Sequence, residues 1–353
     1  MTDKSEFFER LERVVCRELD GVDKLVAADR LTGGASQETY RIRVDGAGGE
    51  RLVAMRRSPG GLRVEADARH PGLEAEAMLM QSARNAGVPE PEVFYVLDSS
   101  DGLGDGFVME WLEGEALGAR IVRSDRFARL RPGLARECGR IMARIHGIDV
   151  SATGLDQYLS KVSPEEFVHQ TWDNYKQLET PQPMIDYAAR WLLDHLPENY
   201  APSLVHNDFR NGNFMVDEHG INAVLDWELA HIGDPMRDLG WICVNSWRFG
   251  GDKPVGGFGS YEDLFAGYEE ESGYRIDPAA VKFWEVFGSI LVGRRLPRHG
   301  RALPHGAGPD GGATCHRPPD QRVPGRLRQP ADTRAGDSHC TGNAHRQSRY
   351  AAR

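Results

Sequence analysis

A change in hydrophobic pattern near residue 113 most constrains what this chain of 353 residues can fold into. Before that point, short apolar runs with β-branched residues and Gly-rich breaks predict a hairpin-rich sheet. An amphipathic helix is expected over residues 7–19, and a second helix over residues 71–86. The strands are expected at residues 25–31, 39–44, 51–56, 93–97 and 107–112.

Long helical patterns dominate the sequence after residue 113. The helices are expected at residues 126–146, 164–178, 184–196, 261–271 and 278–292. The strands expected here are residues 213–216 and 222–225, which the turn Asp217–Gly220 joins into a small hairpin. We therefore expect an α+β fold with two lobes, a small β-rich N-terminal lobe and a larger helical C-terminal lobe, with a cleft between them.

The net charge of −10 argues against a nucleic-acid-binding protein. Residues 295–353 carry 11 Arg and no Lys against 4 Asp or Glu, so residues 1–294 hold a net charge of −17. We interpret this as a solvated acidic surface, with attraction of a cationic substrate as the alternative. No apolar run approaches the length of a membrane span, and the N-terminus shows no leader pattern. The five cysteines form no C-x-x-C pair. We expect a cytoplasmic protein without membrane partners.

The composition of residues 295–353 differs from that of the rest of the chain. This segment lacks Lys, Glu, Ile, Met, Phe and Trp and is rich in Arg, Pro, Gly, Ala and His. It is predicted to be either a natural disordered tail or the product of a shifted reading frame, which sequencing of the coding DNA would decide. A shifted frame would remove the final helices of the lobe and leave Phe283, Trp284 and Phe287 uncovered.

The strongest chemical signal is His206-x-Asp208-x-x-x-x-Asn213, followed by Asp226 at the end of the next apolar run. Phosphoryl transfer from ATP needs a carboxylate that orients the attacking hydroxyl and accepts its proton, and oxygen ligands for Mg²⁺. One loop with Asp208 and Asn213 supplies a carboxylate and an amide oxygen. Asp226 adds a second carboxylate. The combination predicts an ATP- and Mg²⁺-dependent kinase that acts on a small molecule.

These residues, with Leu225-Asp-Trp-Glu228, resemble the aminoglycoside phosphotransferase-like family, a branch of the protein-kinase-like fold. The similarity spans residues 25–292 and is strongest to kinase-like domains fused to acyl-CoA dehydrogenases. It implies that Asp208 is the catalytic residue and that Asn213 and Asp226 bind the metal.

The resemblance also implies that the two lobes have different functions. Residues 1–112 would form the nucleotide-binding lobe, and residues 113–294 the catalytic and substrate lobe. In the segment Gly233-Asp-Pro-Met-Arg-Asp-Leu-Gly240, Asp234 and Asp238 are interpreted as residues that cap and brace the lobe. His206 is interpreted as holding its loop by hydrogen bonds.

The phosphates of ATP are expected to lie against small residues and one cation. Gly33, Gly34 and Ser36, between the first two strands, would let backbone N–H groups approach the phosphates. Arg56 stands on the third strand, where kinases carry a phosphate-binding Lys. Arg keeps the charge but presents a planar fork, so its contact with phosphate would differ. Glu76, on the following helix, is expected to pair with Arg56.

Adenine is expected to contact backbone atoms near Glu110 and Leu112, at the hinge between the lobes. The phosphate acceptor stays open among aminoglycosides, other small alcohols or amino alcohols, and hydroxyacyl thioesters, and nothing indicates an oligomeric state. The acceptor pocket has four aromatic candidates, for which a place in the core is the alternative: Trp172, Tyr175, Trp247 and Phe249.

Two other functions compete with a kinase. A nucleotide-binding pseudokinase that acts as a scaffold would explain why Arg56 replaces the expected Lys. A metal-dependent hydrolase built on His206 and Asp208 would need further His ligands nearby, and the sequence does not place them at ligand spacing.

Overall fold

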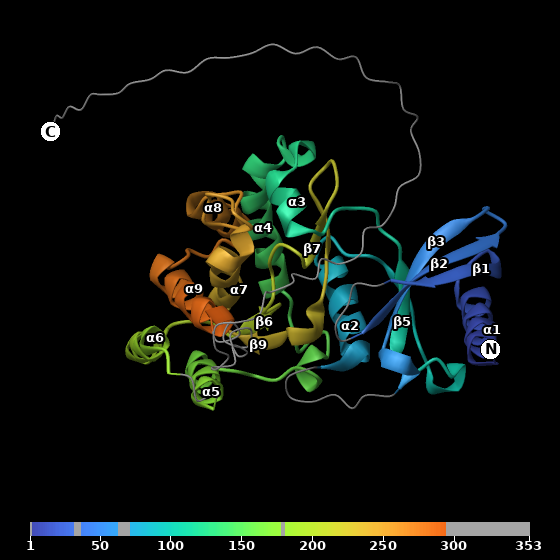
Figure 1. Cartoon of the computed structure of the whole chain (residues 1–353), viewed down its shortest axis with the longest axis horizontal. Helices are drawn as coiled ribbons and strands as arrows, with labels where there is room; N and C mark the ends of the chain where they lie inside the picture. Colours follow the sequence, from blue (N-terminus) through green and yellow to red (C-terminus); the bar gives the residue numbers. More distant parts are fainter. Residues whose placement is uncertain (1, 32–36, 63–70, 178–180, 294–353) are drawn as a thin grey trace, which may run out of the picture. The chain divides into compact units, whose positions relative to one another are not determined.

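The computed structural model describes residues 2–31, 37–62, 71–177 and 181–293. Within these residues, a five-stranded antiparallel sheet forms the first part of the chain and helices form most of the rest (Figure 1). The expected α+β class is confirmed. The segment 295–353, with its two competing explanations, lies outside the described residues.

The large sheet has the strand order β1-β2-β3-β5-β4. Its strands and the two helices that cover it are α1 (Thr2–Glu18), β1 (Val22–Arg30), β2 (Glu38–Gly46), β3 (Arg51–Arg57), α2 (Gly72–Asn85), β4 (Val93–Val96) and β5 (Gly106–Glu110). The two helices take opposite faces because neighbouring residues of a strand point to opposite sides. On β5, Val108 belongs to the core that α1 closes, whereas Phe107 packs in the core that contains Leu79 of α2.

The helical part contains seven α-helices among the described residues and two small sheets. The helices are α3 (Gly118–Arg123), α4 (Arg131–His146), α5 (Pro164–Lys176), α6 (Pro183–Asp194), α7 (Met236–Cys243), α8 (Tyr261–Ser272) and α9 (Pro278–Gly293). The expected hairpin is present as β7 (Phe214–Val216) and β8 (Ile221–Val224). The second small sheet, which the sequence pattern missed, pairs β6 (Ser203–Val205) with β9 (His231–Gly233).

Two glycines allow α4 and α8 to approach closely. A Cβ atom at Gly139 would collide with the backbone carbonyl of Leu264, and one at Gly267 would collide with that of Arg136. The close approach brings His146, the last residue of α4, to Tyr268 of α8, where the His146 Nδ1 and the tyrosine oxygen lie 3.0 Å apart.

Helix α9 is covered by its neighbours. Phe283, Trp284 and Phe287 are each 1% exposed, so the expectation that they would be left uncovered is wrong. The ring of Phe167 in α5 lies 5.9 Å from the rings of Trp284 and Phe287, and the guanidinium of Arg237 in α7 lies over the same two rings. Helices that the chain forms before α9 therefore bury these residues.

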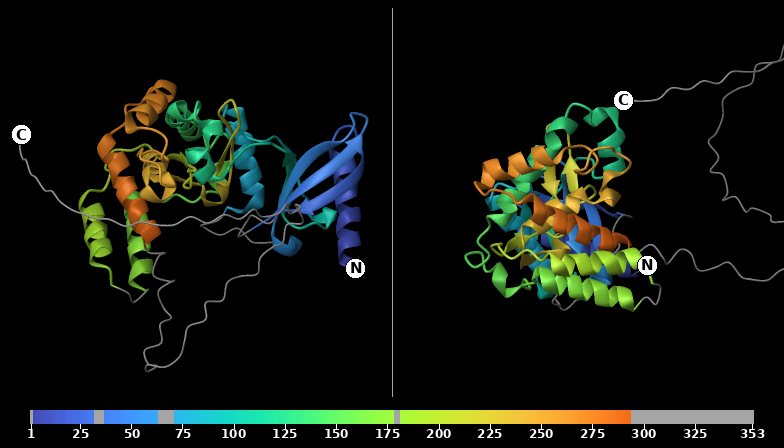
Figure 2. Two further views of the ribbon diagram at one scale, coloured as in Figure 1. Left: turned by 45° about the horizontal axis from the view of Figure 1, so that its top comes forward. Right: turned by 90° about the vertical axis from the view of Figure 1, so that its left-hand side faces the viewer.

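Helices α5 and α6 lie side by side (Figure 2). They are joined by Trp172 and Tyr175, for which the sequence allowed either a place in the acceptor pocket or a place in the core. Trp172 Nε1 donates to Asp186 Oδ1 at 3.1 Å, and the hydroxyl of Tyr175 donates to Asp186 Oδ2 at 3.4 Å. Tyr175 is buried. These two aromatic residues therefore brace α5 against α6.

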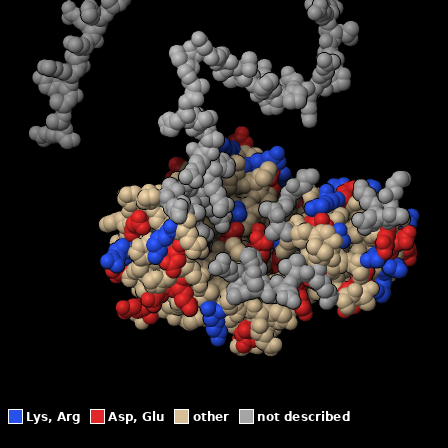
Figure 3. Space-filling view, turned by 60° about the horizontal axis from the view of Figure 1, so that its bottom comes forward, with Lys and Arg blue, Asp and Glu red and all other residues tan. Residues whose placement is uncertain are grey.

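The described surface carries charges of both signs. Figure 3 shows one face on which Lys and Arg side chains are interspersed with Asp and Glu. Among the described residues, no helix is both long enough and apolar enough to cross a membrane.

Candidate active site

The small hairpin brings Asn213 and Asp226 to the same end of two paired strands. Asn213 directly precedes β7, and Asp226 comes two residues after β8. The register pairs Phe214 with Val224, and the backbone N–H of Leu225 donates to the Asn213 carbonyl at 2.8 Å. Residues twelve positions apart in the sequence therefore become neighbours through backbone pairing.

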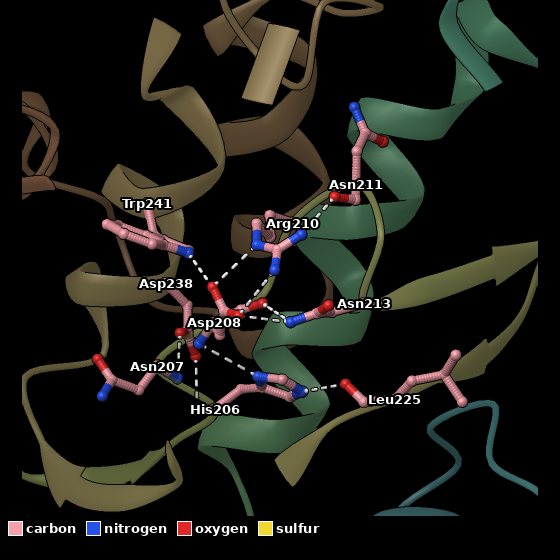
Figure 4. Close-up of polar contacts among 9 residues, drawn as sticks. All are labelled: His206, Asn207, Asp208, Arg210, Asn211, Asn213, Leu225, Asp238 and Trp241. Carbon is pink, nitrogen blue, oxygen red and sulfur yellow. Dashed lines mark hydrogen bonds and ion pairs between the residues drawn. The ribbon is translucent and has the colours of Figure 1, made fainter. Parts of the chain in front are cut away.

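The loop between β6 and β7 is held by Asp238 of α7 (Figure 4). One oxygen of Asp238 accepts the backbone N–H of His206 at 2.9 Å, and the other accepts that of Asn207 at 2.7 Å. Asn207 has a φ of 68°, an uncommon conformation that these bonds help to maintain. His206 Nε2 bonds to the Leu225 carbonyl at 3.1 Å, which ties the loop to the hairpin. Asp238 and His206 thus do the bracing that the sequence suggested.

Asp238 remains a carboxylate although it is completely buried. Burial by itself would raise its pKa, but the hydrogen bond and charge of His146, with the backbone N–H of His206, hold the pKa below its ordinary value. The His146 Nε2 atom lies 3.1 Å from Asp238 Oδ2. The catalytic loop is therefore anchored on a buried charged group, which makes its position sensitive to α4 and α7.

Asp208 lies at the centre of the loop and accepts hydrogen bonds from three side chains (Figure 4). Arg210 contacts both of its oxygens, with Nε at 3.0 Å and Nη2 at 3.2 Å. Trp241 Nε1 donates at 2.6 Å, and Asn213 Nδ2 donates at 2.6 Å. The Asp208 side chain is 15% exposed. A carboxylate fixed in this way and open at one side can orient a hydroxyl and accept its proton.

Asp226 is held against the sheet by Arg56. Arg56 Nη2 donates to Asp226 Oδ1 at 2.8 Å, and Arg56 Nε lies 3.1 Å from Glu76 Oε1. Arg56 also donates to the side chain of Gln37. The predicted pairing of Arg56 with Glu76 is therefore confirmed. Asp226 has a φ of 71°, and its side chain is 34% exposed.

Glu76 titrates near neutral pH in the folded protein. Burial raises its pKa to about 7, an effect that the charge of Arg56 only partly offsets. The side chain is 2% exposed, and among the residues that the structure describes no hydrogen-bond partner is found for its Oε2 atom. The strength of the Arg56–Glu76 pair is therefore expected to depend on pH.

We expect Glu76→Gln to flatten the dependence of stability on pH between 4.5 and 7. In this window the folded protein, with a raised pKa, binds more protons than the unfolded chain. The free energy of unfolding of the wild type therefore falls as pH rises through this window, by up to about 3 kcal/mol from this group. Urea unfolding at several pH values measures the free energy of unfolding of the wild type and the variant. Glu74→Gln, an exposed change on the same helix, serves as the control; equal slopes in both variants would contradict the assignment.

Of the other residues predicted to bind the nucleotide, the structure describes only Glu110 and Leu112. Gly33, Gly34 and Ser36 lie outside the described residues. Glu110 ends β5, and its backbone N–H donates to the Glu92 carbonyl at 2.8 Å. Leu112 follows it, partly exposed, in the connection to the helical part. Because the N–H of Glu110 is used, the contact of adenine with backbone N–H groups is better assigned to Leu112 and stays a prediction.

Sequence reasoning missed several residues of the site. Arg210 stands two positions after Asp208 and was visible within the motif, but its pairing was not foreseen. Trp241 comes from α7, a helix that the pattern did not reveal. Glu90 is buried beside the site and accepts from Trp227 Nε1 at 3.0 Å, and burial raises its pKa well above the ordinary value. No local pattern marks Glu90, because its environment depends on the contact of α2 with the segment after β8.

Two side chains near Asp208, those of Asn213 and Asp226, could provide oxygen ligands for a metal ion that a nucleotide brings with it. Asn213 uses its amide nitrogen toward Asp208, and within the described part of the chain its oxygen takes no hydrogen bond. Mg²⁺ in nucleotide sites is commonly held by one or two protein oxygens together with phosphates. Asn213 and Asp226 fit that arrangement. The described residues contain no group of three or more His, Cys, Asp or Glu side chains placed to hold a metal.

Comparisons with known proteins match most of the chain. The model of the phosphotransferase enzyme family matches residues 28–284. Acyl-CoA dehydrogenase family member 10 of Mus musculus is 33% identical over 221 residues, which cover 60% of this chain and 20% of that protein. The chain therefore spans only a fifth of the length of this relative.

Solved structures share the fold. A Ralstonia eutropha protein classed as an aminoglycoside phosphotransferase superposes with a TM-score of 0.64 at 24% identity, covering 83% of this chain and 90% of its own. An aminoglycoside 2′-phosphotransferase in complex with GDP gives a TM-score of 0.54 at 16% identity, covering 83% and 92% of the two chains.

Proposed function

We propose, since this chain belongs to the phosphotransferase enzyme family, that it transfers the γ-phosphate of ATP to a hydroxyl group of a small molecule. The observation that carries the proposal is the convergence of Asp208, Asn213 and Asp226 through the β7–β8 pairing. A loop that presents a carboxylate beside metal-binding oxygens is what phosphoryl transfer requires. The nucleotide-bound relative of the same fold supports a nucleotide as donor.

Each of the three residues has a distinct task in the proposed reaction. Asp208 orients the acceptor hydroxyl and takes its proton as the bond to phosphorus forms. Asn213 and Asp226 hold Mg²⁺, which supplies charge neutralisation for the phosphates. Residues 1–112 bind the nucleotide and residues 113–294 bind the acceptor and carry the catalytic loop.

Arg56 is the cation proposed to contact the phosphates. In the structure it neutralises Asp226 at 2.8 Å, and the same guanidinium would contact the phosphates of a bound nucleotide. Glu76, buried 3.1 Å from Arg56 Nε, holds the charge in place. The replacement of Lys by Arg56 was the reason to consider a pseudokinase. Arg56 occupies the position of the expected Lys and forms the expected ion pair with Glu76, so the replacement does not favour a pseudokinase.

We expect Arg56→Met to lower kcat/KM for ATP by roughly 10²-fold, because one phosphate contact and the neutralisation of two carboxylates are lost. Arg56→Lys keeps the charge and should retain most of the activity. Steady-state kinetics with varied ATP measure both variants. A Met variant as active as the wild type would remove Arg56 from the phosphate site.

The surroundings of Asp208 bear on the class of acceptor. Arg210 pairs with Asp208, and its guanidinium lies 4.4 Å from the ring centre of Trp247. The rings of Trp241 and Trp247 are 5.3 Å apart. The Arg210 charge is neutralised by its pair with Asp208, so the two indoles add aromatic surface beside the catalytic carboxylate. Aromatic faces contact both apolar groups and organic cations, so these surroundings select no single class among aminoglycosides, small alcohols or amino alcohols, and hydroxyacyl thioesters.

The proposal is tested by measuring ADP formation with a panel of hydroxyl compounds. The panel contains amino alcohols, hydroxyacyl thioesters and aminoglycosides, each with ATP or GTP and with Mg²⁺ or EDTA. We expect Mg²⁺-dependent ADP release that at least one acceptor stimulates and that Asp208→Asn loses. Equal rates in the wild type and the variant with every acceptor would instead leave the nucleotide-binding scaffold as the function.

A further inference from the structure

A cavity of about 690 Å³ lies away from the catalytic carboxylates. The segment after α6, part of α8 and the first turns of α9 line it, and Asp208, Asn213 and Asp226 are not among the lining residues. Its volume lies within the range of about 300 to 1,000 Å³ that small-molecule sites occupy. The proposed phosphoryl transfer makes no use of it.

The lining of the cavity is aromatic and acidic. The aromatic side chains of Trp, Tyr and Phe are Trp191, Tyr200, Tyr268, Tyr274 and Phe283, and the carboxylates are Glu198, Asp234 and Asp277. Lys282 also lines it, but its ammonium pairs with Glu285 at 3.2 Å, a residue outside the lining. Aromatic faces together with an excess of carboxylates attract organic cations.

Asp234 is the deepest of these carboxylates and is 1% exposed. Its oxygens accept the backbone N–H of Met236 at 2.9 Å and the indole N–H of Trp284 at 2.7 Å, two neutral donors. Burial raises the pKa of Asp234, an effect that its hydrogen bonds from Trp284 and Met236 and the charge of His146 only partly offset. A cation in the cavity would provide further compensation.

The floor of the cavity is connected to the catalytic loop by hydrogen bonds. Tyr268 and His146 both line it, and they contact each other at 3.0 Å. His146 contacts Asp238 at 3.1 Å, and Asp238 holds the backbone N–H groups of His206 and Asn207. Three successive contacts thus link a cavity wall to the residue before Asp208.

We infer that this cavity is a binding site for a small aromatic ammonium compound, and that its occupancy is transmitted to the catalytic loop through Tyr268, His146 and Asp238. The inference that the cavity binds a ligand is drawn only from the residues that line it. The inference that this ligand changes a reaction rate also rests on the proposed function. A ligand that moves the Tyr268 hydroxyl changes the contact that fixes His146, and with it the loop.

Binding is tested with 2-phenylethylamine, which is protonated at pH 7, by saturation-transfer NMR and calorimetric titration. The comparators are the neutral 2-phenylethanol and the anionic 3-phenylpropanoate. We expect the amine to bind about fivefold or more tighter than the alcohol and the anion to bind weakest. Equal affinities, an anion that binds tightest, or no binding of the amine overturns the assignment.

The location is tested with Ala280→Trp, which fills the cavity from α9. The control is Ala152→Trp, at an exposed position remote from the cavity lining. We expect the first to abolish amine binding and the second to leave it unchanged, with both unfolding cooperatively. Tyr274→Leu, at a side chain 51% exposed, gives a test that spares the core and should weaken binding severalfold. Binding that survives both cavity variants rules out this site.

The connection is tested by hydrogen exchange of the amides of His206 to Asp208. We expect the amine to change their exchange rates severalfold in the wild type and not in Tyr268→Phe, which still binds the amine. Unchanged exchange in the wild type refutes the connection. This readout needs no turnover, so a chain without phosphotransferase activity that still shows the exchange effect would defeat the proposed function and leave the cavity assignment intact.

Discussion

Asp208→Asn is expected to lower kcat by about 10²- to 10⁴-fold while the protein stays folded and still binds ATP. The amide has nearly the shape of the carboxylate and can still accept the indole N–H of Trp241. It cannot take the proton of the acceptor, and it no longer pairs with Arg210 as an ion. The loss should therefore fall on kcat, with KM for ATP changed by no more than about threefold.

Steady-state kinetics with the best acceptor of the panel, together with thermal unfolding, measure this variant. Asp194→Asn, at an exposed position at the end of α6, is the matched control and should behave as the wild type. An Asp208→Asn protein with wild-type kcat would exclude Asp208 as the base. A loss that appears only as a raised KM would assign it to binding instead.

Asp226→Asn is expected to remove the dependence of nucleotide binding on Mg²⁺ and to lower kcat/KM by roughly 10²- to 10³-fold. Asn is among the residues that tolerate the positive φ of this position, so the backbone should be retained. The change removes the carboxylate charge that a divalent cation prefers. It also releases Arg56 from its contact with Asp226.

Thermal stabilisation by ATP with Mg²⁺, compared with ATP and EDTA, measures this effect directly. We expect the wild type to be stabilised more in the presence of the metal, and Asp226→Asn to respond equally in both solutions. Asp217→Asn, in the turn of the same hairpin, should respond as the wild type because its oxygen can still accept the turn N–H groups. A metal-dependent shift that persists in Asp226→Asn would place the metal elsewhere.

The elements that the sequence predicted are those whose pattern is local. In β2, buried residues alternate with more exposed ones, and α1 buries Leu11, Val14 and Val15 at helical spacing, so these periods are readable in the residues themselves. Helix α7 was missed because its eight residues make only about two turns, and because its polar residues Arg237 and Asp238 are buried, so that burial does not follow the polarity of the sequence. Strands β6 and β9 were missed because each has only three residues.

The residues of the candidate site that could be predicted from the sequence are likewise those marked by a local pattern. The spacing within residues 206–213 and the position of Asp226 are properties of one short stretch of chain, and they sufficed to nominate the base and the metal ligands. The pairing of Arg56 with Glu76 was also accessible, because a strand and the helix that follows it are the expected carriers. These assignments need only the order of residues and the chemistry of their side chains.

The sequence by itself therefore determined which class of reaction is proposed and which residues are nominated for it, because the motif that carries both lies on one short loop. Only the tertiary structure decided what holds that loop and what surrounds it. Asp238 and Trp241 come from α7 and His146 comes from α4, two helices far apart in the sequence. Gly139 and Gly267 let α4 approach α8, whose Tyr268 contacts His146. Contacts of this kind depend on how buried surfaces fit together, and no periodicity in the chain encodes that fit.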